Sequence, residues 1–353
     1  MQRTRYGRMG RTAALLAGLA VIVLPGCNSN ETHPPAADAT ARQSPAVTSR
    51  MTTVLPEKKE QKIVLGFSQL GAESAWRMAN TNSIMEAAKE LDIELHFSDG
   101  QQKQENQIKA IRSFIAQKVD VIAFSPVVES GWEPVLKEAK DAGIPVIVTD
   151  RAVDVSDPSL YVTYMGSDFL EEGRKAGKYL LDKMAGRSGP IRIVELQGTA
   201  GSAPTIDRKR GFEEIIQQNP DMVITKSQTG DFTRAKGKEI MEAMLKSGGN
   251  HIDVLFSHND DMAIGAIQAI EEFGLKPGKD IIIVSVDGGR SAFQYMVDGK
   301  INCIVECNPL LGPQLMQAVK ELEAGRILPK RIVKSEGVFT QEMAAKELPN
   351  RKY

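Results

Sequence analysis

Short apolar runs alternate with segments of helical periodicity along the chain from about Lys62 onward. The apolar runs include KIVLGF (62–67), VIAF (121–124) and DIIIVSV (280–286), and helix-like segments such as QIKAIRSFIAQK (107–118) and DMAIGAIQAIEEFG (261–274) lie between them. A run that is apolar at nearly every position predicts a strand buried on both faces, and alternation with helices is typical of parallel sheets. The pattern therefore predicts an α/β fold with helices on both faces of its sheets.

The number of predicted strands indicates two lobes. About five strands precede Tyr161 and about as many follow it in the chain of 353 residues, although no sequence repeat relates the two halves. A chain of this length is also long enough for two hydrophobic cores. We therefore predict two doubly wound parallel-sheet lobes.

The first 26 residues have the pattern of an export signal. Four arginines precede an apolar run at 13–24, which is shorter than the ~20 residues of a transmembrane helix. The closing Leu24-Pro25-Gly26-Cys27 resembles the lipobox of bacterial lipoproteins, which implies that 1–26 is a lipoprotein signal peptide and that Cys27 carries the lipid. A plain secretory signal cut nearby, with Cys27 incidental, is the alternative. In both cases we expect an exported protein.

The segment that follows, 27–60, is rich in Pro, Ala, Thr and Ser and lacks hydrophobic periodicity. This composition predicts a disordered tether, which would hold the folded lobes away from the membrane. We therefore expect a periplasmic or otherwise extracytoplasmic protein that is lipid-anchored to the membrane.

Composition and motifs argue against several function classes. The formal net charge of −1 gives no electrostatic reason for binding nucleic acid, and the four histidines lack metal-ligand spacing. The loop GTAGSAP (198–204) lacks the GK[ST] ending of a phosphate-binding loop, and the chain has no GxSxG elbow. We therefore predict no metal, no cofactor and no catalytic residue, and a protein that is not an enzyme.

Two cysteines, Cys303 and Cys307, follow the predicted signal. On an extended strand they would lie roughly 13 Å apart, which is too far for a disulfide. We expect them to be small apolar packing residues.

Polar loops follow many of the predicted strands. They include GFSQLGAESAWR (66–77), VTDR (148–151), FSHNDD (256–261) and SVDG (285–288). Ligands of open α/β sheets gather at the carboxyl ends of the strands. One polar loop is weak evidence, but Asp, Asn and Arg accumulate in both halves, which predicts a ligand cleft between the two lobes.

The residue types in these loops suit a neutral sugar. A sugar presents hydroxyls at its rim and C–H groups on its faces, so its recognition needs an aromatic plane and charged groups that form paired hydrogen bonds. Trp76 can supply the plane. The candidates for the rim are Glu73, Arg77, Asp150, Arg151, Arg208, Asn259, Asp287 and Glu306. Four carboxylates against three guanidiniums sum to −1, which favours an uncharged polyol over a phosphorylated or carboxylated ligand.

Several of these residues also have structural interpretations. Trp76 could instead anchor the start of the helix that follows it. Asp150 and Arg151 could form a surface ion pair of little energetic value. We expect Asp260 and Asp261 to cap the next helix, which would leave Asn259 for the ligand.

Longer motifs relate the chain to a known family. They include DGQQKQENQIKA (99–110), GWEPVLKEAKDA (131–142), IDRKRGF (206–212) and HNDDMAIGAIQAI (258–270). From about Lys62 to its end, the chain resembles the type I solute-binding proteins of ABC sugar importers, the ribose-binding class, and within it the members that bind galactofuranose.

This resemblance implies a hinge and a division into lobes. The chain would cross between the lobes near 163–166, 304–307 and 335–340. The first lobe would comprise 61–164 and 307–336, and the second 165–306 and 337–353. The resemblance implies that Glu73, Trp76, Arg77, Asp150 and Arg151 line the cleft from the first lobe, that Arg208, Asn259 and Asp287 line it from the second, and that Glu306 lies near a crossing. Phe232 is a further candidate for an apolar wall.

The implied function is binding of a neutral monosaccharide, of the galactofuranose type, and its delivery to ABC permease subunits in the membrane by closure of the two lobes. We expect a monomer. The alternative is a ligand-sensing receptor of the same fold that docks a chemotaxis or kinase partner. A transcriptional repressor of this fold would carry an N-terminal helix-turn-helix and no export signal, so the N-terminus argues against it.

Overall fold

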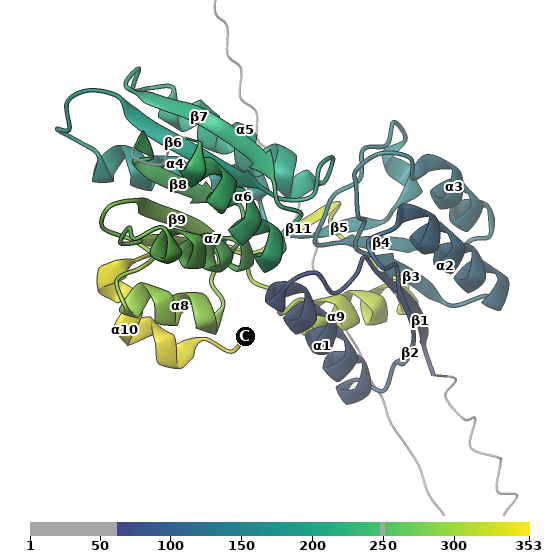
Figure 1. The fold of residues 1–353 in the computed structure, drawn as a ribbon. Coiled ribbons are helices and arrows are strands. Elements are labelled where there is room, and N and C mark those ends of the chain that lie inside the picture. The colour runs from purple at the N-terminus through teal and green to yellow at the C-terminus, as the bar shows by residue number, and fades with distance from the viewer. Residues whose placement is uncertain (1–61, 248–250) are drawn as a thin grey trace, which may run out of the picture. The chain divides into compact units, whose positions relative to one another are not determined.

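The computed structural model describes residues 62–247 and 251–353, which belong to one compact unit of the chain (Figure 1). The predicted signal peptide (1–26), Cys27 and the predicted tether (27–60) lie outside the described residues. Among the helices that are described, none is both long enough and apolar enough to span a membrane.

The first lobe is built on a six-stranded sheet in which every pairing is parallel. Two clusters of buried side chains cover its faces, because neighbouring residues of a strand point to opposite sides: Phe124 packs with α2 and α3, and Ala123 packs with α1 and α9. The strands in spatial order are β11 (Arg331–Val333), β5 (Thr163–Gly166), β4 (Val146–Thr149), β3 (Val121–Phe124), β1 (Val64–Gln69) and β2 (Glu94–Asp99), and the helices are α1 (Ala75–Glu90), α2 (Gln104–Gln117), α3 (Glu133–Asp141) and α9 (Gly312–Glu323).

The second lobe repeats this architecture with one difference. Its six-stranded sheet is parallel except for the edge strand β12 (Val338–Thr340), which runs antiparallel to β10 (Cys303–Glu306). The remaining strands follow β10 in the order β9 (Ile282–Asp287), β8 (Val254–Ser257), β6 (Ile191–Gln197) and β7 (Met222–Thr229). The last strand thus departs from the all-parallel prediction, since it is reached from the first lobe and not through a helix of its own lobe.

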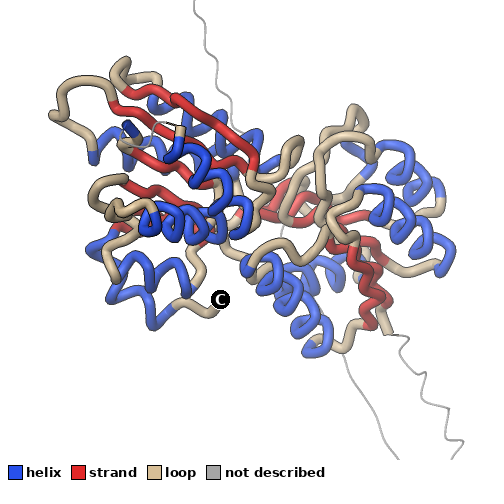
Figure 2. Tube along the Cα trace, viewed as in Figure 1, coloured by secondary structure: helices blue, strands red, loops and turns tan. Residues whose placement is uncertain are grey.

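Helices cover both faces of the second sheet (Figure 2). One face packs against α4 (Phe169–Lys183) and α5 (Ala203–Ile216), and the other against α6 (Arg234–Lys246), α7 (Asp260–Glu272) and α8 (Arg290–Val297). Short helical segments complete the described chain: η1 (Pro158–Leu160), η3 (Gln341–Met343), α10 (Ala344–Glu347) and η4 (Leu348–Asn350). The prediction of two doubly wound α/β lobes is confirmed.

Three short segments connect the lobes. They are 167–168 between β5 and α4, 307–311 between β10 and α9, and 334–337 between β11 and β12. The crossings expected at 163–166, 304–307 and 335–340 overlap strands, and the expected boundary at 164/165 falls inside β5, where Met165 and Gly166 pair within the first sheet. The first two crossings begin later than expected because β5 and β10 continue to Gly166 and Glu306, whereas the third begins one residue earlier and ends where β12 starts.

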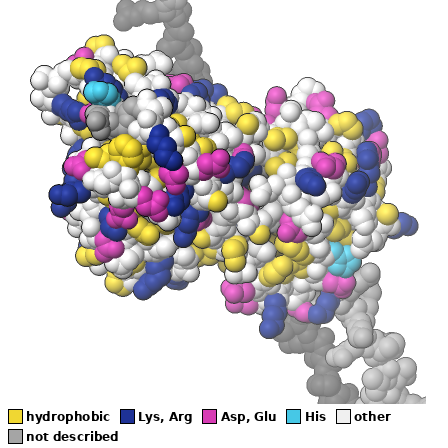
Figure 3. All heavy atoms as spheres, viewed as in Figure 1, with side chains coloured by type: hydrophobic (Ala, Val, Ile, Leu, Met, Phe, Trp, Pro, Cys, Tyr) yellow, Lys and Arg dark blue, Asp and Glu magenta, His cyan; other side chains and the backbone are white. Residues whose placement is uncertain are grey.

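On the face shown in Figure 3, Lys and Arg side chains are interspersed with Asp and Glu side chains. This distribution accords with the formal net charge of −1. Mixed charges of this kind favour solubility and do not form the basic face that phosphate backbones attract.

Candidate ligand-binding site

A small hollow is lined by residues of both lobes. Its lining residues are Glu73, Ser74, Trp76, Arg77, Asp150 and Arg151 from the first lobe, Phe169, Pro204, Arg208, Phe232, Asn259 and Asp287 from the second, and Cys307 from a connecting segment.

Trp76 lies in the first turn of α1, where the local sequence fixes its position. Ser74 caps this helix by accepting a hydrogen bond of 3.1 Å from the backbone N–H of Arg77. The indole Nε1 of Trp76 donates to the backbone oxygen of Cys307 at 2.6 Å, and only 8% of the residue is exposed. The ring therefore forms a wall of the hollow and at the same time anchors the helix start, so the two interpretations of Trp76 are compatible.

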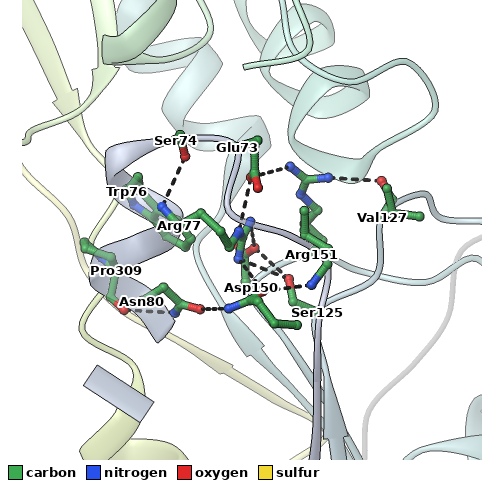
Figure 4. Close-up of polar contacts among 12 residues, drawn as sticks. Glu73, Ser74, Trp76, Arg77, Asn80, Ser125, Val127, Asp150, Arg151 and Pro309 are labelled. Atoms are coloured by element: carbon green, nitrogen blue, oxygen red, sulfur yellow. Dashed lines mark hydrogen bonds and ion pairs between the residues drawn. The ribbon is translucent and has the colours of Figure 1, made fainter. Parts of the chain in front are cut away.

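Arg77 is the centre of a buried polar network in the first lobe (Figure 4). Its guanidinium bonds Asp150 at 2.6 Å and Glu73 at 3.2 Å, and Ser125 donates to the same Asp150 oxygen at 2.8 Å. Burial opposes the charged form of Arg77, but the charges of Asp150 and Glu73 outweigh it and raise the pKa of Arg77. The network holds these side chains in fixed rotamers.

Arg151 is buried beside this network. It donates to the backbone oxygen of Val127 at 3.0 Å and lies 3.6 Å from Glu73. Burial and the nearby Arg77 lower the pKa of Arg151 to about 10. With 2% of Arg151 and 5% of Asp150 exposed, the surface ion-pair interpretation of these two residues is excluded.

Two polar atoms of the first-lobe wall have no hydrogen-bond partner among the described residues. They are Oε2 of Glu73 and Nε of Arg151. A buried polar group without a partner costs about 1–3 kcal/mol, more when it is charged. One acceptor and one donor are therefore available to a ligand that carries hydroxyl groups.

Arg208 lies at the second-lobe side of the hollow because α4 and α5 approach closely. A Cβ on Gly173 would lie 2.2 Å from the Arg208 carbonyl oxygen, and one on Gly211 would lie 2.0 Å from the Leu170 oxygen. The Arg208 guanidinium donates to Glu172 at 2.7 Å and lies 5.2 Å from the ring of Phe169. Burial opposes its charge, yet Glu172 outweighs burial and raises the pKa of Arg208.

Asn259 is the N-cap of α7, which corrects the expectation that Asp260 and Asp261 cap this helix. Its Oδ1 accepts from the N–H of Met262 at 3.0 Å, and its Nδ2 donates to the Phe232 oxygen at 3.1 Å. An amide has two donors and two acceptor sites, so one of each remains for a ligand. Asp260 and Asp261 lie in the first turn of α7 and accept hydrogen bonds from residues outside this helix.

Strained backbone occurs at three residues that line the hollow. Asp150 has a φ of 59°, Phe232 a φ of 62° and Asp287 a φ of 124°. Such conformations cost about 1–3 kcal/mol each and cluster at functional sites. Burial and the charge of Asp260 raise the pKa of Asp287, although Arg208 lies 4.0 Å away.

The structure does not bring Glu306 to the hollow. Its carboxylate accepts from Arg351 at 3.0 Å and from the backbone N–H of Gly337 at 3.2 Å, and it is not among the lining residues. The other eight candidates lie together in the lining, and so does Phe232.

Sequence analysis missed four lining residues: Ser74, Phe169, Pro204 and Cys307. Phe169 follows β5 in the polar segment MGSDF, a strand-end loop of the same kind as those that carry the other candidates. Cys303 and Cys307 are free, buried and part of one apolar cluster, which confirms their packing role. Cys307 additionally presents its backbone oxygen to Trp76.

Hydrogen bonds donated by backbone N–H groups also join the two lobes. The N–H of Ala75 in the first lobe donates to Asp261 at 2.7 Å, and the N–H of Glu129 donates to the Gly201 oxygen at 2.9 Å. The rings of Trp76 and Phe169 pack in one cluster although they come from different lobes. The lining is therefore assembled only where the two lobes meet.

The chain belongs to the family of the periplasmic binding protein domain, whose model matches residues 65–327. It is 47% identical over 293 residues to the galactofuranose-binding protein YtfQ of Escherichia coli, which covers 82% of this chain and 92% of the relative. Membership of this family makes the chain a binding protein and not an enzyme.

Solved structures agree with this assignment. A Mycobacterium smegmatis protein in complex with β-D-fucofuranose shares 56% identity, with a TM-score of 0.81 over 82% of this chain and 95% of that one. The periplasmic binding protein of the arabinose ABC transporter from Shewanella sp. ANA-3, bound to α- and β-L-arabinofuranose, shares 52% identity, with a TM-score of 0.79 over the same shares of the two chains.

Proposed function

We propose that this protein is a receptor that binds a neutral monosaccharide in its furanose form and delivers it to an ABC importer. The observation that carries the proposal is the lining of the hollow. Three carboxylates (Glu73, Asp150, Asp287) and three guanidiniums (Arg77, Arg151, Arg208) sum to a formal charge of zero, beside the rings of Trp76 and Phe169. A ligand with a net charge would pair with one of these groups and so leave the opposite charge of that group's former partner uncompensated in a buried site.

Each part of the sugar has a matching group. Trp76 and Phe169 offer apolar surface to the C–H groups of the ring. The free Glu73 oxygen, the free Arg151 N–H and the remaining capacity of Asn259 offer hydrogen bonds to hydroxyls. The main role of Arg77 is to hold Glu73 and Asp150 in position by hydrogen bonds. A hydrogen bond to a charged group contributes about 1.5–3 kcal/mol.

Similarity supports the furanose form. The Escherichia coli relative is named for galactofuranose, and the two solved structures hold fucofuranose and arabinofuranose. Galactofuranose and fucofuranose share a five-membered ring and differ in their exocyclic group. We therefore propose an aldofuranose of the galactofuranose type as the ligand.

Closure of the lobes is the proposed mechanism of delivery. The bonds from Ala75 to Asp261 and from Glu129 to Gly201 join the lobes and would break if they separated. A ligand that contacts Glu73 in one lobe and Asn259 in the other favours the closed state, because it gains contacts only there. The permease would then recognise the closed protein.

The pattern of the N-terminus supports an exported, lipid-anchored receptor outside the cytoplasm. Cys27→Ala is expected to abolish incorporation of radiolabelled palmitate and to release the protein from membranes, with sugar affinity unchanged. Palmitate labelling that persists in this variant would contradict the lipid anchor, and a plain secretory signal would then be the better interpretation.

Two experiments test the binding function. Calorimetric titration should show binding of L-arabinose or D-galactose and none of galacturonate or galactose 6-phosphate. The ring form follows from the ¹³C resonance of the bound anomeric carbon in ¹³C-labelled sugar. A pyranose resonance would contradict the furanose proposal, and tighter binding of the charged sugars would contradict the neutral one. Sugar uptake into membrane vesicles with the importer separates delivery from a purely sensory role.

A further inference from the structure

The three segments that connect the lobes meet at one buried polar cluster. Ser167 lies in the first segment, Cys307 in the second and Glu336 in the third. The Ser167 hydroxyl donates to Oε1 of Glu336 at 2.7 Å and lies 3.4 Å from the Cys307 sulfur. The backbone N–H of Asn308 donates to the same Glu336 oxygen at 2.7 Å. Glu336 therefore joins all three connections.

A second carboxyl group, that of Glu172 on α4, lies against this cluster. One carboxyl oxygen each of Glu172 and Glu336 and the sulfur of Cys307 all lie within 4.8 Å of one another. Only 1% of Glu172 and 9% of Glu336 is exposed. One oxygen of Glu172 bonds Arg208, while the other, Oε1, has no partner among the described residues.

Two carboxyl groups this close and this buried do not both ionise easily, since like charges repel strongly where water is excluded. Such pairs hold one proton between them. Arg208 already supplies one positive charge to Glu172, so a single proton on the pair leaves the three groups without net charge. The same balance makes a metal cation unfavourable here.

We propose that Glu172 and Glu336 share one proton and act as positioning residues that hold Arg208 in the hollow, so that sugar affinity falls when this proton is lost. The inference rests on the proposed function, because Arg208 is a lining residue of the proposed sugar site. It adds a pH-dependent element at the point where the two lobes are connected.

The titration behaviour of the groups agrees with this arrangement. Burial and the charge of Glu172 raise the pKa of Glu336 to about 9. Burial also raises the pKa of Glu172, although Arg208 opposes this effect. Burial raises the pKa of the Cys307 thiol, which therefore stays protonated beside the pair.

Other charged groups surround the pair. Lys175 donates to the Glu336 backbone oxygen at 2.7 Å, and Arg331 pairs with Asp168 at 3.1 Å. The hollow outside Glu336 is lined by Asp168, Glu171, Glu172, Lys175 and Lys334, and Asp287 faces Arg208 from β9. The acidic and basic groups around the pair are nearly balanced in number. The repulsion between the two carboxyl groups themselves therefore dominates their protonation.

Glu336→Gln is the decisive variant, because glutamine imitates the protonated carboxyl group. Its amide oxygen can accept from Ser167 and Asn308, and its amide N–H can donate to Glu172. Affinity for L-arabinose or D-galactose, whichever binds the wild type more tightly, is measured by calorimetry from about pH 6.5 to about pH 9.5. We expect the wild type to lose affinity about fourfold or more over this range and the variant to change by less than about twofold.

A matched control is Glu171→Gln, which removes the same charge from the neighbouring position of α4, where the side chain is 49% exposed. It should keep the wild-type pH dependence. Glu172→Gln should weaken binding about tenfold or more at neutral pH, because Arg208 loses its anchoring charge. If Glu172→Gln does not fold, the comparison of wild type with Glu336→Gln still decides the inference.

The melting temperature without sugar provides an independent readout. A raised pKa means that the folded protein holds a proton which the unfolded chain releases. Its stabilisation is complete below the ordinary glutamate pKa and is lost as pH rises through about 9. The melting temperature of the wild type should therefore fall more than that of Glu336→Gln between pH 5 and pH 9.5.

Equal pH dependence of both proteins in both measurements would overturn the inference. A wild type that binds no sugar at any pH would overturn the proposed function, while the sugar-free comparison would still decide the shared proton.

Discussion

The indole Nε1 of Trp76 donates a hydrogen bond of 2.6 Å to the backbone oxygen of Cys307. Trp76 lies in the first turn of α1 in the first lobe, and Cys307 lies in the segment that connects β10 to α9. The ring that lines the hollow is thus tied directly to a connection between the lobes. Removing the ring and removing only its N–H should therefore have different consequences.

Trp76→Ala is expected to abolish sugar binding, and Trp76→Phe is expected to weaken it by about tenfold or less, because phenylalanine keeps an aromatic face and loses a hydrogen bond of about 0.5–1.5 kcal/mol. Calorimetry with the tightest-binding neutral sugar measures both effects. The control is Trp132→Phe, since Trp132 also donates to a backbone oxygen but is absent from the lining. Trp132→Phe should lower stability and leave affinity unchanged; unchanged affinity in Trp76→Ala would refute the assigned wall.

Arg151→Ala should eliminate the rise in melting temperature that sugar produces and leave the sugar-free fold intact. Arg151 contributes the free Nε donor of the first-lobe wall, and its removal leaves Glu73 with one cation fewer. Thermal melts with and without sugar measure the effect. Arg112→Ala is the comparison, because Arg112 pairs with the exposed Glu138 and is not a lining residue. A sugar-induced shift of wild-type size in Arg151→Ala would contradict its role.

Gly173→Ala should lower both stability and sugar affinity. The added methyl would meet the Arg208 carbonyl oxygen at 2.2 Å, so α4 and α5 must separate. Overpacking of this kind costs about 1–3 kcal/mol and would displace the Arg208 side chain. Chemical denaturation and calorimetry on the same variant measure the two effects. Lys178→Ala on the exposed side of α4 should change neither. A stability loss without any affinity loss would show that α4 does not position Arg208.

Asp260 should make the protein less stable as pH rises from about 4 to about 7. Burial raises the pKa of Asp260 to about 7, although Ser285 and two backbone N–H groups favour its charged form. Because the folded pKa lies above the unfolded one, this group stabilises the fold fully below its ordinary pKa, and the stabilisation is lost as pH approaches 7. The contribution changes by at most about 1.4 kcal/mol per pH unit. Denaturant unfolding at several pH values should give a flatter profile for Asp260→Asn than for the wild type; parallel profiles would exclude this titration.

Much of the site was predictable because strand ends are visible in the sequence. Arg77, Asp150, Arg151, Asn259 and Asp287 all follow apolar runs, and the carboxyl ends of parallel strands converge at one edge of a sheet. The two-lobe α/β architecture followed from the same apolar runs. Local spacing carries this information, so the tertiary structure was not needed to find it.

Glu306 and Asp287 show where local information ends. Both stand at the end of a strand, and they are direct partners in the register of β10 and β9. Asp287 lines the hollow, whereas Glu306 pairs with Arg351 from the C-terminal segment. An ion pair between residues 45 positions apart depends on how the chain end packs, and no periodicity encodes it.

The sequence alone determined the alternation of strands and helices and the residue types at the strand ends, since both depend on neighbours along the chain. The tertiary structure alone decided that Phe169 packs in one cluster with Trp76, that the Cys307 carbonyl accepts a hydrogen bond from the indole, and that Glu172 lies against Glu336. These contacts join residues that lie far apart in the sequence. They form only when long-range packing brings those segments to one place.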